Sequence, residues 1–212
     1  MLTRQRPDVA AVGLTGGIGA GKSTALSFFA EAGALTLSAD AVVHRLYARP
    51  DVKRALADHF AAEALDSDGE VDRRRLAGAV RGRPDQLRWL ESLTHPLVGE
   101  EIVRFIREAP AGAIVVCEVP LLFEAGMEGL FDLVITVEAG SEARRRRSVH
   151  SFGPEIFGEL EALQASTERR VAGSDLKFVN DGNVEHLREF VGVAYARARA
   201  LAVSAAGAGE GR

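Results

Sequence analysis

Several residue types are scarce in this sequence, and each shortage excludes a class of protein. Cysteine occurs once in the 212 residues, as Cys117, which excludes a disulfide framework and a cysteine-based zinc site. Lysine occurs at three positions and the formal net charge is -4, so the chain has no broad basic field. We therefore expect no nucleic-acid partner.

Long apolar runs are missing as well. No stretch approaches the ~18 consecutive apolar residues that a membrane-spanning helix needs. The polar start at residues 1–8 is not followed by a signal-peptide core. These absences predict a cytoplasmic protein with no membrane partner. The composition, 47% hydrophobic and 26% charged, is typical of a globular domain and excludes collagen, a coiled coil and wholesale disorder.

Short apolar runs predict buried strands. They are rich in β-branched residues and do not alternate with polar ones, a pattern typical of a parallel sheet that is buried on both faces. The runs, of which the last is the weakest, are residues 10–15, 34–38, 113–117, 133–137 and 176–179.

Helical patterns lie between these runs. They cover residues 23–32, 40–49, 52–64, 84–93, 97–108 and 184–205. Residues 94–96, which end at Pro96, separate the fourth pattern from the fifth, and residues 206–212 are expected to form a frayed tail. Strands that alternate with helices predict an α/β fold with right-handed crossovers. The long helical stretch between the second and third strands predicts an insertion that carries part of a binding site.

A phosphate-binding loop follows the first predicted strand. Residues 16–23, hereafter the P-loop, read GGIGAGKS and match G-x-x-x-x-G-K-[ST] without a mismatch, between a strand and a helix. Its glycines allow close approach of a phosphate, and its N–H groups point into one concavity at a helix N-terminus. Lys22 reaches the outer phosphates, and the hydroxyl of Ser23 holds Mg²⁺. The P-loop predicts binding of a nucleoside triphosphate and fits a kinase, a switch or a motor alike.

Two carboxylates come at strand ends, where ligands bind in open α/β sheets. Asp40 follows the second predicted strand, and a kinase acting on a hydroxyl needs a carboxylate there to take the proton. The alternative for Asp40 is an N-cap of the next helix. Glu118 follows the third strand and is a possible second magnesium ligand or, alternatively, a surface acid. The guanine-reading Asn-Lys-x-Asp motif of GTPase switches does not occur, which favours a small-molecule kinase.

The order of these motifs resembles the dephospho-coenzyme A kinase family. The most distinctive stretch is residues 119–126, which read VPLLFEAG. Other matching stretches are residues 13–24, 38–44, His95-Pro96, 131–137, Gln164 and 175–182. The resemblance runs from about residue 12 to residue 182, which is most of the chain.

The resemblance implies ATP-dependent phosphorylation of the ribose 3′-hydroxyl of dephospho-CoA, with Mg²⁺, as the last step of CoA biosynthesis. It implies a five-stranded parallel sheet P-loop kinase core with a helical substrate-binding insertion and a lid. The core is expected at about 9–40, 112–138 and 174–205, the CoA-binding insertion at about 41–111 and the lid at about 141–168. The partners implied are the small molecules ATP and dephospho-CoA, and we expect a monomer or a weak homo-oligomer.

The resemblance also implies roles for individual residues. Asp40 is the base, and Lys22 with the lid arginines Arg144 and Arg147 stabilises the transferred phosphoryl group. The residues expected to contact ATP are Gly17, Gly19, Ala20, Gly21, Lys22, Ser23, Thr24 and Asn180. The residues expected on the acceptor side are Asp40, His44, His95, Leu121, Leu122 and Glu124.

The sequence departs from the family pattern in three places, one of which is that residues 160–163, LEAL, precede Gln164 without the usual arginine. Ser38 stands where the family has the first aspartate of Asp-Ala-Asp, and the four arginines at 144–147 are not followed by Arg-Asp. Four consecutive side chains cannot share one helix face, so we expect one or two to act and the others to be solvated. Mutual repulsion of these arginines predicts an open resting lid, with a break at residues 151–154. The alternatives are another P-loop kinase of the nucleoside or nucleotide type, or a nucleotide-binding module with an impaired lid.

Overall fold

The computed structural model describes residues 6–152 and 154–209. The chain divides into two compact units. Unit 1 comprises Met1–Ala39 with Ile102–Arg212, and unit 2 comprises Asp40–Glu101. No helix among the described residues combines the length and the apolar character needed to cross a membrane.

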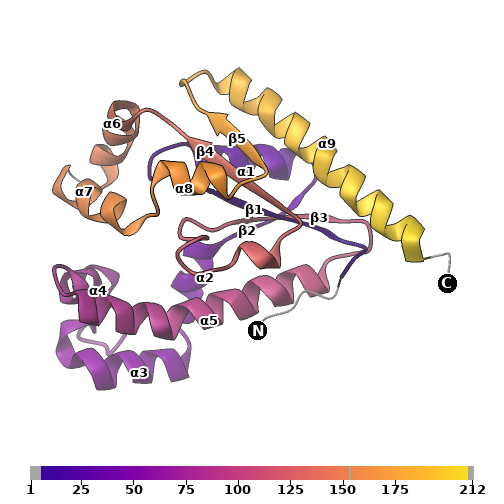
Figure 1. Cartoon of the computed structure of the whole chain (residues 1–212). Helices are drawn as coiled ribbons and strands as arrows, with labels where there is room; N and C mark the ends of the chain where they lie inside the picture. The colour runs from indigo at the N-terminus through magenta and orange to yellow at the C-terminus, as the bar shows by residue number, and fades with distance from the viewer. Residues whose placement is uncertain (1–5, 153, 210–212) are drawn as a thin grey trace. The chain divides into compact units, whose positions relative to one another are not determined.

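Unit 1 is built on a five-stranded sheet in which every pair of neighbours is parallel (Figure 1). The strands are β1 (Ala10–Gly16), β2 (Leu35–Ser38), β3 (Ile114–Glu118), β4 (Leu133–Glu138) and β5 (Leu176–Val179), in the order β2-β3-β1-β4-β5. Every residue of the three inner strands is buried, whereas the two edge strands are partly exposed. The predicted α/β fold with five parallel strands is confirmed.

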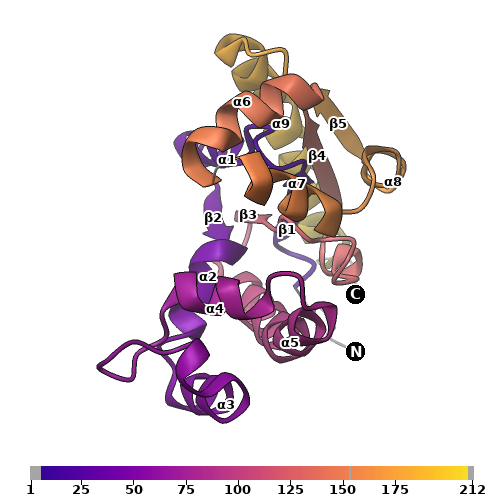
Figure 2. The same ribbon diagram turned by 90° about the vertical axis from the view of Figure 1, so that its left-hand side faces the viewer.

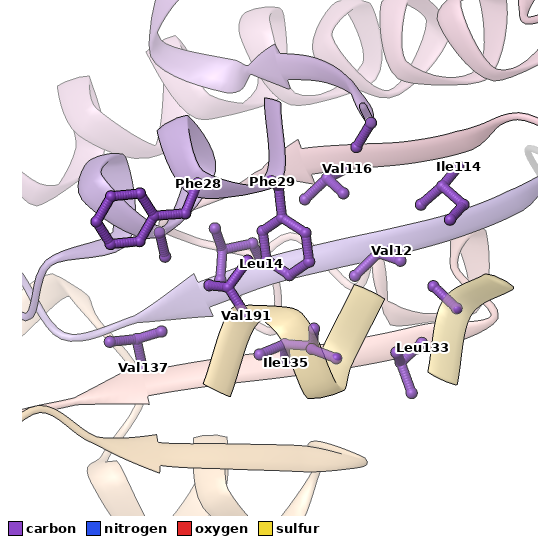
Figure 3. Close-up of a cluster of buried hydrophobic side chains, with 14 of the residues drawn as sticks. Val12, Leu14, Phe28, Phe29, Ile114, Val116, Leu133, Ile135, Val137 and Val191 are labelled. Carbon is purple, nitrogen blue, oxygen red and sulfur yellow. The ribbon is translucent and has the colours of Figure 1, made fainter. Parts of the chain in front are cut away.

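Two helices supply the core on one face of the sheet. They are α1 (Lys22–Glu31) and α9 (Val184–Gly209). Figure 3 shows that Leu14 of β1 and Ile135 of β4 lie beside Phe29 of α1 and Val191 of α9 in one apolar cluster. Burial of each large apolar side chain contributes roughly 1.5–3 kcal/mol, so this cluster fixes the central strand and the helix that follows the P-loop.

The opposite face of β1 depends on Gly13. A Cβ atom at this position would lie 2.7 Å from the Phe131 ring and 2.8 Å from the Leu122 side chain. The segment between β3 and β4, which includes a 3-10 turn at Glu128–Leu130, therefore packs directly on the backbone of β1. The short helix α8 (Thr167–Ala172) also packs against β1 and β4.

The helices of the predicted lid follow β4. They are α6 (Ser141–Phe152) and α7 (Pro154–Leu163), which pack against each other (Figure 2). Gly153, within the predicted break at residues 151–154, lies outside the described residues.

Unit 2 is helical and has a small core of its own. Its elements are α2 (Ala39–Leu46), α3 (Pro50–Phe60), a 3-10 turn (Ala61–Glu63), α4 (Arg73–Val80) and the first part of α5 (Pro84–Glu108). The core consists of Val52, Leu56, Phe60, Ala64, Leu76 and Ala79, with Trp89, Leu93 and Leu97 packed against it. Helix α4 begins at an N-cap, because Asp72 accepts hydrogen bonds from the N–H groups of Arg74 (2.8 Å) and Arg75 (3.1 Å).

Two helix predictions were wrong. The predicted break at residues 94–96 is absent, because α5 continues through Pro96. Leu93 and Leu97 on either side of the proline pack against the core of unit 2, and this packing outweighs the backbone hydrogen bond that proline removes. The predicted frayed tail is also wrong as far as it is described, since α9 is helical to Gly209.

Candidate active site

The P-loop joins the carboxyl end of the central strand to α1. Gly16 has a φ of 143°, and a Cβ atom there would lie 1.9 Å from the carbonyl oxygen of Val137. Gly21 is the N-cap of α1 with a φ of 107°, and no side chain caps this helix. The glycines therefore shape the loop, and the first-turn N–H groups of α1 are left for an anion.

Lys22 carries a positive charge inside the P-loop. Its side chain is buried, and Nζ donates to the carbonyl oxygens of Gly16 (3.0 Å) and Gly17 (3.1 Å). The ammonium group is thus held at the centre of the loop, where a phosphate would meet both it and the backbone N–H groups.

Ser23 and Glu118 meet at the start of α1. The Ser23 hydroxyl donates to Oε1 of Glu118 at 3.4 Å, and Glu118 is buried. Glu118 is the last residue of β3 and pairs in register with Leu14 on one side and Ser38 on the other. The interpretation of Glu118 as a surface acid was wrong, because two neighbouring strands cover it. The described residues contain no cluster of three or more His, Cys, Asp or Glu side chains that could hold a metal.

Two of the four consecutive arginines lie at the P-loop. Arg144 is buried, its Nε donates to the carbonyl of Ala139 (3.0 Å), and it forms an ion pair with Glu161 of α7 at 2.6 Å. A Cβ atom on Gly17 would lie 3.0 Å from Cδ of Arg144. Arg147 donates to the carbonyl of Gly19 at 3.3 Å.

Arg145 and Arg146 do not contact the P-loop, and they are exposed, as Arg147 also is. Arg146 pairs with Glu142 at 2.7 Å on the surface of α6. The run is therefore divided between a pair that contacts the P-loop and a pair that does not, as the geometry of a helix requires. Two of the four, Arg144 and Arg146, have acidic partners that reduce their mutual repulsion, and the open resting lid stays a prediction.

Asn180 supports the P-loop from the end of β5. Its Nδ2 donates to the carbonyl of Ala20 (2.8 Å), and its backbone N–H donates to the carbonyl of Glu138 (2.7 Å). A Cβ atom on Gly21 would lie 2.5 Å from Nδ2 of Asn180, so only glycine fits there. Thr24, also expected to contact ATP, is exposed in the first turn of α1.

A buried polar network behind the P-loop was missed by sequence reasoning. Arg170 of α8 donates through Nε and Nη2 to both carboxylate oxygens of Glu138, at 2.6 and 2.8 Å, and both side chains are buried. Gln164 contacts the P-loop at Gly16 and Ile18, a role that sequence analysis did not predict. The sequence did contain a signal for the Arg170–Glu138 pair, because Glu138 ends a buried strand and a buried carboxylate needs a partner.

The acceptor-side residues of unit 2 lie on two helices. Asp40 and His44 are exposed and one turn apart on α2, and His95 is half-buried on α5. The interpretation of Asp40 as an N-cap was wrong, because α2 already begins at Ala39 and Asp40 lies within its first turn.

The acceptor-side residues of unit 1, Leu121, Leu122 and Glu124, differ in exposure and in hydrogen bonding. Leu121 is partly exposed, whereas Leu122 is fully buried in the core, and substrate binding by the two stays a prediction. Oε1 of Glu124 accepts the N–H of Ala165, and its buried Oε2 has no hydrogen-bond partner among the described residues. In this structure Glu124 therefore holds the segment that follows α7.

Cys117 takes no part in the chemistry of the site. It is buried in β3, and burial raises the pKa of its thiol to about 12. The thiol is therefore uncharged near neutral pH and behaves as a small apolar group.

Comparisons with known proteins agree with this geometry. A family model described as Dephospho-CoA kinase matches residues 10–186. The dephospho-CoA kinase of Streptomyces avermitilis is 38% identical over 189 residues, which cover 87% of this chain and 92% of that protein.

Solved structures share the fold of this chain. A crystal structure of a protein from Thermus thermophilus superposes with a TM-score of 0.76 and 31% identity, covering 91% of this chain and 98% of that one. The dephospho-CoA kinase from Campylobacter jejuni shares the fold, with a TM-score of 0.59 and 19% identity over 90% of this chain and 97% of its own. With the family model matching most of its length, this chain belongs to the dephospho-CoA kinase family.

Proposed function

We propose that this protein transfers the γ-phosphoryl group of ATP to the ribose 3′-hydroxyl of dephospho-CoA, the last step of CoA biosynthesis. The observation that carries the proposal is the convergence of Lys22, Arg144 and Arg147 on the P-loop in a chain of this family. Phosphoryl transfer depends on positioning and on neutralising the charge of the transferred group, and three cations at one loop supply both.

ATP binds with its phosphates in the P-loop. Lys22 exchanges its two carbonyl partners for phosphate oxygens, which form stronger, charge-assisted hydrogen bonds. Asn180 holds the Ala20 carbonyl and so keeps the second half of the loop in shape. The proposal gives the nucleotide contacts to Gly17, Gly19, Ala20, Gly21, Lys22, Ser23, Thr24 and Asn180.

Ser23 and Glu118 would hold Mg²⁺. A hydroxyl and a carboxylate are the oxygen ligands that this ion prefers, and it commonly takes its remaining ligands from phosphates and water. The pair therefore fits the ion, although the described residues contain no larger acidic cluster. When bound, Mg²⁺ neutralises charge on the β- and γ-phosphates.

The proposed lid, about residues 141–168, contributes Arg144 and Arg147. Both stabilise the charge that spreads over the transferred oxygens. Arg144 is held by Glu161 at 2.6 Å, so closure on the phosphates exchanges one anionic partner for another. Two anionic substrates supply the differential affinity that lid closure needs, and closure excludes water from the reaction.

Asp40 accepts the proton of the ribose hydroxyl. It follows the carboxyl end of β2 by two residues and is exposed, so its carboxylate is available to a substrate. His44, His95 and Leu121 belong to the acceptor side of the site. We also propose that the protein acts in the cytoplasm on these small molecules, as a monomer or weak homo-oligomer without nucleic-acid or membrane partners.

A coupled assay of ADP release tests the proposal. ADP is expected only when ATP, Mg²⁺ and dephospho-CoA are all present, and Lys22→Ala protein serves as the blank. ADP release with adenosine or AMP in place of dephospho-CoA would indicate another nucleoside or nucleotide kinase. Binding of ATP without ADP release for any acceptor would indicate a nucleotide-binding module.

A further inference from the structure

The carbonyl group of Gly16 receives two hydrogen bonds from different sides. Lys22 donates to it through Nζ at 3.0 Å, and Gln164 donates through Nε2 at 3.2 Å. Gly16 is buried at the end of β1. A carbonyl oxygen has two lone pairs, so both donors are accommodated.

We propose that Gln164 is a positioning residue that keeps the Gly16 carbonyl hydrogen-bonded when Lys22 moves to a phosphate. The inference rests on the proposed function to the extent that Lys22 binds ATP. A buried carbonyl that loses its only donor is destabilised, and this loss would oppose nucleotide binding. Because Gln164 remains bonded, Lys22 is released from Gly16 at little cost.

The amide of Gln164 has a single orientation that satisfies its neighbours. Oε1 accepts the N–H of Ile18 at 2.8 Å, while Nε2 also donates to the carbonyl of Pro120 at 3.1 Å. A carboxylate in its place would keep the bond to Ile18 but would present an acceptor to the Gly16 and Pro120 carbonyls. The position therefore requires an amide with its oxygen toward Ile18.

The segment that carries Gln164 is held on both sides. The N–H of Ala165 donates to Glu124, and the Ala165 carbonyl accepts from Nη1 of Arg170. Arg170 in turn is fixed by its two bonds to Glu138 at the end of β4. Gln164 is thus pre-organised against the P-loop at the anchored end of the proposed lid, which gives the buried Arg170–Glu138 pair a role beyond packing.

Gln164→Met and Gln164→Glu test the inference through equilibrium binding of ATP with Mg²⁺, measured by calorimetry without an acceptor. Methionine removes the donor and the acceptor without adding charge, and we expect ATP affinity to fall about tenfold. Glutamate retains only the acceptor, so its affinity should fall at least as far. Gln86→Met, in unit 2, is the matched control and should bind ATP like the wild type. Thermal unfolding of each variant checks that it is folded.

A double-mutant cycle with Lys22→Ala isolates the proposed exchange. Without Lys22, the Gly16 carbonyl has the same partners before and after ATP binds, so Gln164→Met should change ATP affinity less than about twofold in this background. An equal tenfold loss in both backgrounds would overturn the inference. Wild-type affinity in Gln164→Glu would also overturn it, because that variant keeps only the bond from the Ile18 N–H, which would then account for the effect.

Failure of the inference about Gln164 can be distinguished from failure of the proposed reaction. A wild-type protein that binds ATP but forms no CoA would contradict the proposed reaction and leave the test of Gln164 intact. A wild-type protein that does not bind ATP would overturn both.

Discussion

Several charged side chains near the P-loop in unit 1 are buried, among them Lys22, Arg144 and the Arg170–Glu138 pair, whereas the ion pairs described in unit 2 are exposed. The Arg170–Glu138 pair has side chains 4% and 6% exposed, while those of the Arg83–Glu63 pair are 55% and 58% exposed. Buried pairs carry a large desolvation cost, and exposed pairs contribute little to stability. Unit 1 therefore retains costly polar contacts where they shape a loop, and unit 2 relies on its small apolar core.

Asp40 is an exposed charged residue of unit 2 that we propose as the catalytic base, so it departs from this comparison. We predict that Asp40→Asn lowers turnover by about 10²- to 10⁴-fold and changes ATP affinity little, since asparagine cannot take a proton. Steady-state kinetics with calorimetry of ATP binding measure both quantities. Asp58→Asn, an exposed substitution on α3, is the control. An equal loss of ATP binding would assign Asp40 to the metal.

The four consecutive arginines of α6 include two that contact the P-loop and two that do not. We predict that Arg144→Ala and Arg147→Ala each lower turnover by about 10²-fold or more, because both side chains lie at the P-loop. Arg145→Ala and Arg146→Ala should retain wild-type turnover. Kinetics of the four variants under saturating substrates check the division, and equal losses in all four would refute it.

Removal of one partner from each ion pair compares the two units directly. Arg170→Met leaves the Glu138 carboxylate buried without its cation, and we predict a loss of about 3–5 kcal/mol in the free energy of unfolding. Arg83→Met in the exposed pair should cost less than about 1 kcal/mol. Urea unfolding measures both, and similar values would show that burial does not separate the units.

Two further predictions concern the pH dependence of stability. Burial raises the pKa of Cys117, so stability should decline as pH rises from about 8.5, where an unfolded thiol ionises, towards a pKa of about 12. Bonds from the N–H groups of Arg75 and Arg74 lower the pKa of Asp72 in unit 2, so its contribution is present above about pH 4 and lost as pH falls further.

Unfolding midpoints measured across pH check both the decline at alkaline pH assigned to Cys117 and the decline at acid pH assigned to Asp72. Asp72→Asn, which keeps the cap, should flatten the acid limb. The Cys117 thiol should resist alkylation at pH 8 until the protein is unfolded. Rapid alkylation of the folded protein, or an unchanged acid limb in the variant, would contradict the respective assignment.

The sequence was most informative where structure is local. The strand, the P-loop and α1 follow one another along the chain, so their residue types and spacing predicted them together. The division of the four arginines followed from helix geometry alone. These features need no knowledge of distant contacts.

The missed features depend on contacts between distant segments. Helix α5 continues through Pro96 because of the core that surrounds it. The bonds from Gln164 to Gly16 and from Arg170 to Glu138 join residues far apart in the chain. Helix α4 was missed because its sequence is mostly charged and small residues, and its N-cap at Asp72 gave a weak signal.

The central claim is that the P-loop of this chain delivers a phosphoryl group to the 3′-hydroxyl of dephospho-CoA. Phosphorus NMR of a reaction containing ATP, Mg²⁺, dephospho-CoA and the wild-type protein tests it most directly. The account predicts a new phosphomonoester resonance on the ribose, in amounts equal to the ADP formed, and neither product with Asp40→Asn over the same period. ADP accompanied by inorganic phosphate, with no new phosphomonoester, would contradict it.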